Sequence, residues 1–410
     1  MPACKVRWLV MATGERLPVL VSSADGIPMF LPVVWLVSMR RATHRAANTL
    51  HANLQALKLL YTWATRDGID IERRMSDGAF LTNGELAALV GASRQEIGQR
   101  GAKVVGLTKA KQSGVAVDVG VCRETSANRL RTIADYLGWL GREGYARLAP
   151  LEADARLSLC SAMLGHLRAM SPSGKGRNTV GMREGPSSEV MDTILASIEI
   201  DAANNPWQDL GLRVRNRLLI NLFFALGLRR GEALGVRIES IDFRKATLTV
   251  VRAPDDPDDP RTYQPLAKTR DRILPLKEGL ARMIEDYVLR IRSKIPGVRK
   301  HSFLFVSHQT GAPLSLVAVN KVFTSLRERV VGLPENLTPH VMRHAWNDAF
   351  SALMDRKQVT EERETQMRSM MMGWSPTSGT AAVYTRRHVR EEARRASLAH
   401  QLSIVDGGKP

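Results

Sequence analysis

The sequence is poor in cysteine. Its 3 cysteines, Cys4, Cys122 and Cys160, are odd in number and far apart in a chain of 410 residues. This count and this spacing indicate neither a disulfide framework nor a zinc site. A protein whose thiols stay reduced in a cytosolic setting fits such a composition.

Long apolar runs and several common catalytic motifs are also missing. The longest apolar stretches, Leu31–Val37 and Leu218–Leu228, are far shorter than the ~20 residues of a membrane span. The N-terminus lacks a signal-peptide pattern, so we expect a cytoplasmic protein without a membrane partner. There is no His-Glu-x-x-His, no Gly-x4-Gly-Lys-Ser/Thr and no cysteine pair. The sequence therefore lacks the motifs that usually support assignment as a metalloprotease, a P-loop NTPase or a zinc finger.

Acidic residues are outnumbered by basic ones. Lys and Arg together number 59 against 41 Asp and Glu, which gives a formal net charge of +18. This excess indicates a polyanionic partner, nucleic acid before a membrane surface, although an arginine-rich protein that is merely soluble has the same balance. With 44% hydrophobic residues the chain can bury a core, and its length predicts two or three domains.

The first part of the chain changes from strand-like to helical patterning. Residues 4–37 alternate apolar runs with turn signals and predict two or three short strands, the last within Ile27–Val37. Further on, apolar residues recur at three- and four-residue steps, and this period predicts helices at 42–65, 86–90, 124–143 and 151–170. We therefore expect a β-rich arm at 1–40, which stands apart or caps its neighbour, and a helical domain at 41–170.

A stretch rich in Gly, Ser and Pro, residues 171–187, predicts a linker. Its basic residues suit a segment that follows a phosphate backbone, and equally any flexible surface loop. The remaining domain, 188–410, is expected to be mainly α with a small antiparallel β-sheet. Its predicted helices are 188–198, 212–228, 277–293, 316–331, 338–353, 361–372 and about 379–401.

The strands of that domain surround an acidic loop. Two strands are expected within 238–252, and another carries Lys268 and ends near 274–276. Between them, residues 254–260 read Pro-Asp-Asp-Pro-Asp-Asp-Pro, which cannot be a central strand because proline has no N–H to donate. Phosphates would repel its charge, so we place this loop away from a polyanionic partner.

One predicted helix carries a compact group of polar residues. His340, Arg343 and His344 lie three and four positions apart and therefore share a helical face. Thr338 and Pro339 precede them and predict an N-cap and a first-turn proline, so the helix has a defined start.

Other short pieces flank this helix in a fixed order. They are Arg229 with Glu232, Lys268, Gly373 with Trp374, and Tyr384 in a basic neighbourhood. Together with the His-x-x-Arg piece they resemble the tyrosine recombinase (phage integrase) family. The resemblance implies the catalytic residues Arg229, Lys268, His340, Arg343, Trp374 and Tyr384, with Glu232 and His344 in support. It implies no cofactor and no metal ion. It also makes 188–410 a catalytic domain and likens 41–170 to the family's core-binding domain, although a generic helical bundle has the same pattern.

The implied chemistry is cleavage of a DNA phosphodiester. Arg229 and Arg343 can each present a planar fork to its non-bridging oxygens. Tyr384 would attack and form a covalent 3′-phosphotyrosine, which keeps the bond energy so that neither ATP nor a metal is needed. Lys268 is implied as the proton donor to the leaving 5′-oxygen. His340 would accept a hydrogen bond from the tyrosine or hold the phosphate.

The supporting residues have plainer alternatives. Trp374 has one N–H donor, which would reach the phosphate, or the ring only packs against neighbouring helices. Glu232 is expected to orient an arginine or the lysine without transferring a proton. His344 is as readily a histidine satisfied in the core.

The function implied is that of a site-specific recombinase or integrase of a mobile element. Its partner would be double-stranded DNA, bound by a homo-tetramer on paired sites with possible accessory DNA-bending or directionality proteins. The protein would be cytoplasmic and nucleoid-associated. Two alternatives stay open: a type IB topoisomerase-like activity that relaxes DNA, and a DNA-binding regulator that has the same fold without activity.

Overall fold

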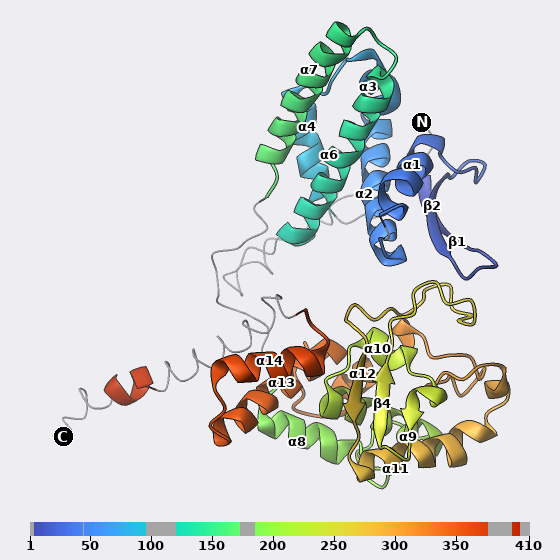
Figure 1. The fold of residues 1–410 in the computed structure, drawn as a ribbon, viewed down its shortest axis with the longest axis vertical. Coiled ribbons are helices and arrows are strands. Elements are labelled where there is room, and N and C mark those ends of the chain that lie inside the picture. The colour runs from blue at the N-terminus through green and yellow to red at the C-terminus, as the bar shows by residue number, and fades with distance from the viewer. Residues whose placement is uncertain (1–3, 44, 96–119, 173–184, 376–395, 402–410) are drawn as a thin grey trace, which may run out of the picture. The chain divides into compact units, whose positions relative to one another are not determined.

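The computed structural model describes residues 4–43, 45–95, 120–172, 185–375 and 396–401. The chain divides into two compact units, Met1–Val180 and Gly181–Pro410 (Figure 1). Most of the expected linker at 171–187, most of the expected helix at about 379–401, and Tyr384 itself lie outside the described residues.

The first unit is a helical bundle covered on one side by a hairpin. Strands β1 (Cys4–Val10) and β2 (Arg16–Ser22) are antiparallel and pair from Cys4 with Ser22 to Val10 with Arg16. Both strands pack on α2, so Cys4 and Leu20 share one hydrophobic core with the bundle. The helices of the unit are α1 (Phe30–Trp35), which continues as a π-helix (Leu36–Arg41), α2 (Ala47–Arg66), α3 (Ile71–Asp77), α4 (Asn83–Ser93), α6 (Arg123–Tyr145) and α7 (Pro150–Ala169).

The prediction of a strand within Ile27–Val37 is wrong, because most of that stretch forms α1 and the start of the π-helix after it. A short apolar run does not distinguish a strand from a buried helix. Here the helical form buries Trp35 and Leu36 in the core, and the Trp35 ring meets Tyr136 edge-on with centroids 5.4 Å apart. Pro32 lies in the first turn, where backbone N–H groups have no acceptor within the helix, so the N–H that proline lacks costs no hydrogen bond.

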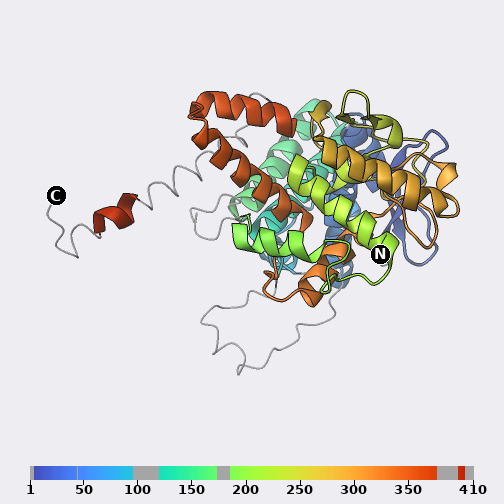
Figure 2. The same cartoon turned by 90° about the horizontal axis from the view of Figure 1, so that it is seen from below.

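The second unit is mainly α with a three-stranded antiparallel sheet, as predicted. The sheet order is β3 (Ile241–Asp242), β4 (Thr247–Val250) and β5 (Arg272–Pro275). The helices are α8 (Ser188–Ser197), α9 (Leu210–Leu226), α10 (Arg230–Gly235), α11 (Glu278–Asp286), α12 (Leu316–Arg329), α13 (Pro339–Arg356) and α14 (Glu361–Met372). Figures 1 and 2 show α13 and α14 next to each other, and Arg368 of α14 donates to Asn347 of α13 at 3.1 Å.

Two local expectations for this unit need correction. Lys268 does not lie on a strand, because β5 begins only at Arg272, and the lysine belongs to the connection between β4 and β5. Thr338 has the extended conformation of an N-cap residue, but its side chain makes no capping hydrogen bond to α13. Pro339 starts that helix as expected.

Two carboxylates of the acidic loop in the β4–β5 connection form ion pairs within the unit. Asp256 accepts from Arg237 at 2.5 Å and Asp259 binds Arg261 at 2.8 Å. Both guanidinium groups lie 4.5 Å from the ring centre of Phe303, within the range of a cation–π contact. These contacts anchor the middle of the long connection that carries Lys268.

Candidate active site

A glycine turn presents Arg229 at the edge of the second unit. Helix α9 ends at Leu226, and Gly227 has the left-handed φ of 60° that lets the chain reverse. A Cβ on Gly227 would lie 2.7 Å from Met372 Cε and 3.0 Å from the Trp346 ring, so only glycine fits there. Arg229 then becomes the N-cap residue of α10.

Glu232, at the third position of α10, is the centre of a buried polar network. Its Oε2 accepts the backbone N–H of Arg229 at 2.9 Å and a side-chain N–H of Arg272 at 2.8 Å. Its Oε1 accepts from the Thr269 hydroxyl at 2.6 Å and from Arg229 Nη1 at 3.2 Å. Arg343 Nη1 lies 3.9 Å from the same carboxylate. One fully buried carboxylate thus joins four side chains from three separate segments.

The protein keeps Glu232 ionised. Burial alone would raise the pKa of this carboxyl, but the charge and hydrogen bond of Arg272, the charge of Arg343 and the Thr269 hydroxyl outweigh it and lower the pKa to about 2. Glu232 is therefore a negative anchor for cations at neutral pH and has no proton to transfer.

Arg343 lies under this network. Its guanidinium donates to the Gly227 carbonyl at 2.5 Å and to the Met372 carbonyl at 3.3 Å, and it lies 5.4 Å from the Trp374 ring centre. The side chain is 2% exposed, whereas that of Arg229 is 27% exposed. Arg229 is therefore partly exposed, whereas Arg343 is buried.

An open, positively charged pocket of ≈ 690 Å³ lies above the network. Arg229, Lys268 and Trp374, three of the residues expected from the sequence, line it. Arg252 and Arg270 add two more cations, against the single carboxylate of Asp271 in its wall. Four basic side chains around one hollow suit a phosphate group, whose charge they attract collectively.

The two histidines of α13 are not among the described residues that line this pocket. His340 is exposed and His344 is half-buried, and their ring centres are 4.6 Å apart in an edge-on contact. Trp374 is 8% exposed and packs with Trp346 and Met372 in a small cluster.

Sequence reasoning missed Thr269, Arg272, Arg252 and Arg270. Arg272 had a readable signal, because it shares the inward face of β5 with Leu274, whereas Ile273 points outward and is 65% exposed. A charged residue on a buried strand face must have a partner. The partner, Glu232, is far away in sequence, so only the fold reveals it.

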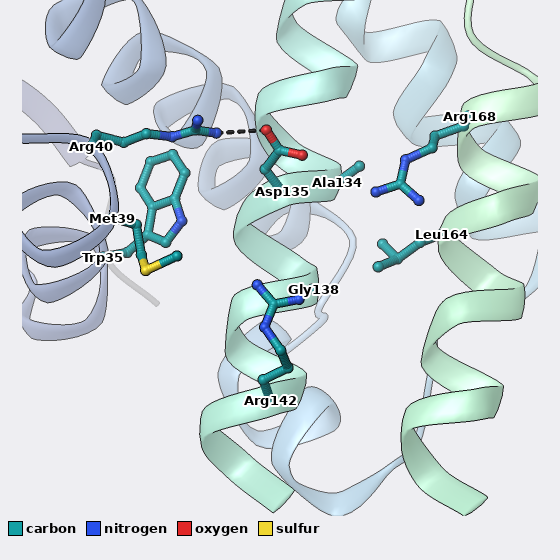
Figure 3. A pocket seen from close by; sticks show the side chains of 9 residues that line it. All are labelled: Trp35, Met39, Arg40, Ala134, Asp135, Gly138, Arg142, Leu164 and Arg168. Atoms are coloured by element: carbon teal, nitrogen blue, oxygen red, sulfur yellow. Dashed lines mark hydrogen bonds and ion pairs between the residues drawn. The ribbon is translucent and has the colours of Figure 1, made fainter. Parts of the chain in front are cut away.

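The first unit has a basic pocket of its own, of ≈ 180 Å³ (Figure 3). Arg40 in its wall binds Asp135 at 2.6 Å and lies 4.9 Å from the ring centre of Trp35. Arg142 of α6 and Arg168 of α7 line the same pocket, and Figure 3 shows Arg168 reaching from α7 toward α6. Among the described residues these two arginines have no ion-pair partner, so their charge is available to an anion.

The sequence model of the phage integrase family matches residues 194–391. The tyrosine recombinase XerD of Halalkalibacterium halodurans is 27% identical over 204 residues, which cover 49% of this chain and 59% of that protein. The tyrosine recombinase XerA of Pyrococcus furiosus is 27% identical over 195 residues, 46% of this chain and 57% of that protein. The chain thus spans less than two thirds of the length of these relatives.

The fold has a counterpart among solved structures. The integrase of the Tn1549 transposon, solved in complex with transposon right-end DNA, superposes with a TM-score of 0.50 at 16% identity and covers 90% of this chain and 100% of that one. None of the described helices is long and apolar enough to cross a membrane. Residues 194–391 therefore form a domain that matches the phage integrase family, and the relatives named above are tyrosine recombinases.

Proposed function

We propose that the protein is a site-specific DNA recombinase that cuts and rejoins strands through a covalent 3′-phosphotyrosine intermediate, without a metal ion or ATP. The observation that carries this proposal is the pocket in which Arg229, Lys268 and Trp374 meet above the ionised Glu232. Positioning and charge stabilisation are the main requirements of phosphoryl transfer, and this pocket supplies both from side chains.

In the proposed step, the Tyr384 oxygen attacks the scissile phosphorus and the bond from phosphorus to the 5′-oxygen breaks. Arg229, which lines the pocket, binds a non-bridging oxygen. Arg343 binds a second one after it exchanges its hydrogen bond to the Gly227 carbonyl for one to the phosphate. Lys268 gives its proton to the departing 5′-oxygen, and His340 accepts the tyrosine proton. Rejoining runs the same step backwards with a new 5′-hydroxyl.

The helical unit would hold the DNA backbone. We assign Arg142 and Arg168 to phosphate contacts, because both line the basic pocket of that unit and lack ion-pair partners among the described residues. Arg40 is already paired with Asp135 and has less charge to offer. We further propose that the active form is a homo-tetramer on two paired sites and serves integration or excision of a mobile element.

The proposal is tested by trapping the covalent intermediate. The full chain is incubated in EDTA with a pool of nicked duplexes of randomised sequence, and protein-linked DNA is collected after denaturation. A nick near the cut lets the short 5′-hydroxyl strand diffuse away, so the adduct accumulates. We expect linked DNA enriched for one sequence from the unmutated protein and none from Tyr384→Phe.

Tyr263→Phe is the matched control, because Tyr263 is 57% exposed in the connection that also carries Lys268. It should form the adduct normally. A regulator without activity would bind DNA and give no adduct from any variant. A metal-dependent nuclease would cut only after magnesium is restored and would leave no protein attached.

A further inference from the structure

The segment that carries Lys268 is braced by its two neighbours. The Thr269 hydroxyl donates to Glu232 Oε1 at 2.6 Å and accepts from Arg272 Nη1 at 3.0 Å. Arg272 Nη2 closes the triangle on Glu232 Oε2 at 2.8 Å. All three side chains are buried, so water does not compete for these hydrogen bonds.

A second brace acts on the backbone one residue further on. The Arg270 N–H donates to the Gly373 carbonyl at 3.0 Å. Gly373 has a left-handed φ of 65°, and a Cβ there would lie 2.9 Å from both the Arg270 carbonyl oxygen and Thr269 Cβ. The C-terminal end of this connection, at Thr269 and Arg270, therefore packs closely against Gly373, the residue before Trp374.

Lys268 itself has no such contacts. It is exposed in the pocket wall and has no hydrogen-bond or ion-pair partner among the described residues. A lysine ammonium on a flexible four-carbon stem is positioned poorly unless its backbone is fixed. Its place in the pocket therefore depends on what holds residues 269–272.

We propose that Thr269 and Arg272 are positioning residues that hold the Lys268 ammonium at the leaving 5′-oxygen, an inference that rests on the proposed function. Neither residue contributes a free positive charge to the phosphate site. Thr269 is neutral, and the Arg272 guanidinium donates its hydrogen bonds to Glu232 and Thr269. Loss of the hydroxyl changes no charge in the site. It loosens the brace and leaves polar atoms of Glu232 and Arg272 without this partner.

The test compares two nicked substrates, one with oxygen and one with sulfur at the 5′-bridging position, drawn from the sequence that the unmutated protein selects. A thiolate leaves without a proton, so a variant that lacks only proton delivery regains its rate on sulfur. The rate of covalent adduct formation is measured in a single turnover for Thr269→Val, Thr269→Ser, Arg272→Lys and Lys268→Ala.

We expect Thr269→Val to be slower on oxygen by about 10- to 100-fold, the effect of a small misplacement of a catalytic group. On sulfur it should come within a few-fold of the unmutated protein, as should Lys268→Ala. Thr269→Ser retains the hydroxyl and should be near normal on both substrates. Arg272→Lys, which cannot bridge two partners as a planar fork can, should follow the valine variant.

Thr249→Val is the matched control. Thr249 lies half-buried on β4 in the same sheet, outside the pocket lining and the Glu232 network, and its variant should behave normally on both substrates. DNA affinity should be unchanged in Thr269→Val, because no phosphate contact is removed.

Each remaining outcome has a distinct meaning. The inference is overturned if Thr269→Val is as fast as the unmutated protein on oxygen, or if it stays slow on sulfur while Lys268→Ala is rescued. If Lys268→Ala is not rescued, the lysine is not the acid, and both that assignment and the inference fail. Absence of any adduct from the unmutated protein rejects the proposed function itself.

Discussion

Replacement of Glu232 by glutamine should destabilise the second unit strongly at neutral pH. The carboxylate is fully buried, and its pKa lies at about 2 instead of the ordinary 4.5. A difference of roughly 2.5 units corresponds to about 3 kcal/mol of unfolding free energy at neutral pH. Glu232→Gln removes this term and leaves Arg272 and Arg343 without their shared counter-charge, for which a loss on the order of 3–5 kcal/mol is typical.

The pH dependence has a definite sign. Because the pKa of Glu232 is lower in the folded protein, its contribution is complete above the unfolded value of 4.5 and disappears as the pH falls toward 2. The stability difference between the unmutated protein and Glu232→Gln should therefore be constant from pH 8 to about 5. At pH 3.5 it should be smaller by about 1 kcal/mol.

Urea unfolding of the full chain, followed by hydrogen-exchange mass spectrometry, measures this difference. Peptides from α10 and β5 report on the second unit alone, which avoids treating two units as one transition. Glu278→Gln is the control, because its ion pair with Arg282 is solvent-exposed and should contribute less than about 1 kcal/mol. The reasoning is refuted if Glu232→Gln is as stable as the control at pH 7, or if its deficit already vanishes between pH 7 and 5.

Three further predictions concern DNA binding, the role of Arg343 and the relaxation of supercoiled DNA. The double variant Arg142→Gln, Arg168→Gln should bind DNA more weakly, and its plot of log affinity against log salt concentration should be less steep by about 2, since each phosphate contact contributes ~0.9 to that slope. The control Arg290→Gln, in the other unit, should change neither quantity. Affinity titrations at several salt concentrations measure both. Arg343→Ala should abolish adduct formation and also destabilise α13, because it strips the Gly227 carbonyl of its donor; an adduct at the normal rate would contradict its role. Supercoiled DNA that lacks the selected sequence should stay supercoiled in an agarose-gel assay, and its relaxation would indicate a topoisomerase.

Local sequence patterns predicted those features of the fold that depend on residues close together in the sequence. Glu232 is expected from the family resemblance to orient an arginine or the lysine, and in the structure its carboxylate accepts the backbone N–H of Arg229 at 2.9 Å and Arg229 Nη1 at 3.2 Å, across the first turn of α10. The same holds for the start of α13 at Pro339. Both features depend on residues within a single helical turn, whose geometry is constant.

The remaining contacts join segments that are distant in sequence. Thr269 reaches Glu232 across 37 residues and Arg272 reaches it across 40, so no periodicity in the chain reveals either bond. The helix at Phe30–Trp35 is decided by the burial of Trp35 against Tyr136, again a long-range contact. Helix α3 has only 7 residues, too few for a clear period, and it is marked instead by its Asp70 cap.

Identification of the amino acid that is joined to DNA tests the account most directly. The trapped complex formed in EDTA is digested with protease and nuclease, and mass spectrometry locates the residual nucleotide on the peptide. We predict a 3′-phosphodiester on the oxygen of Tyr384, one of the chain's 6 tyrosines. A nucleotide on Tyr263 or on any other residue, or cut DNA with no attached peptide, would contradict the central claim.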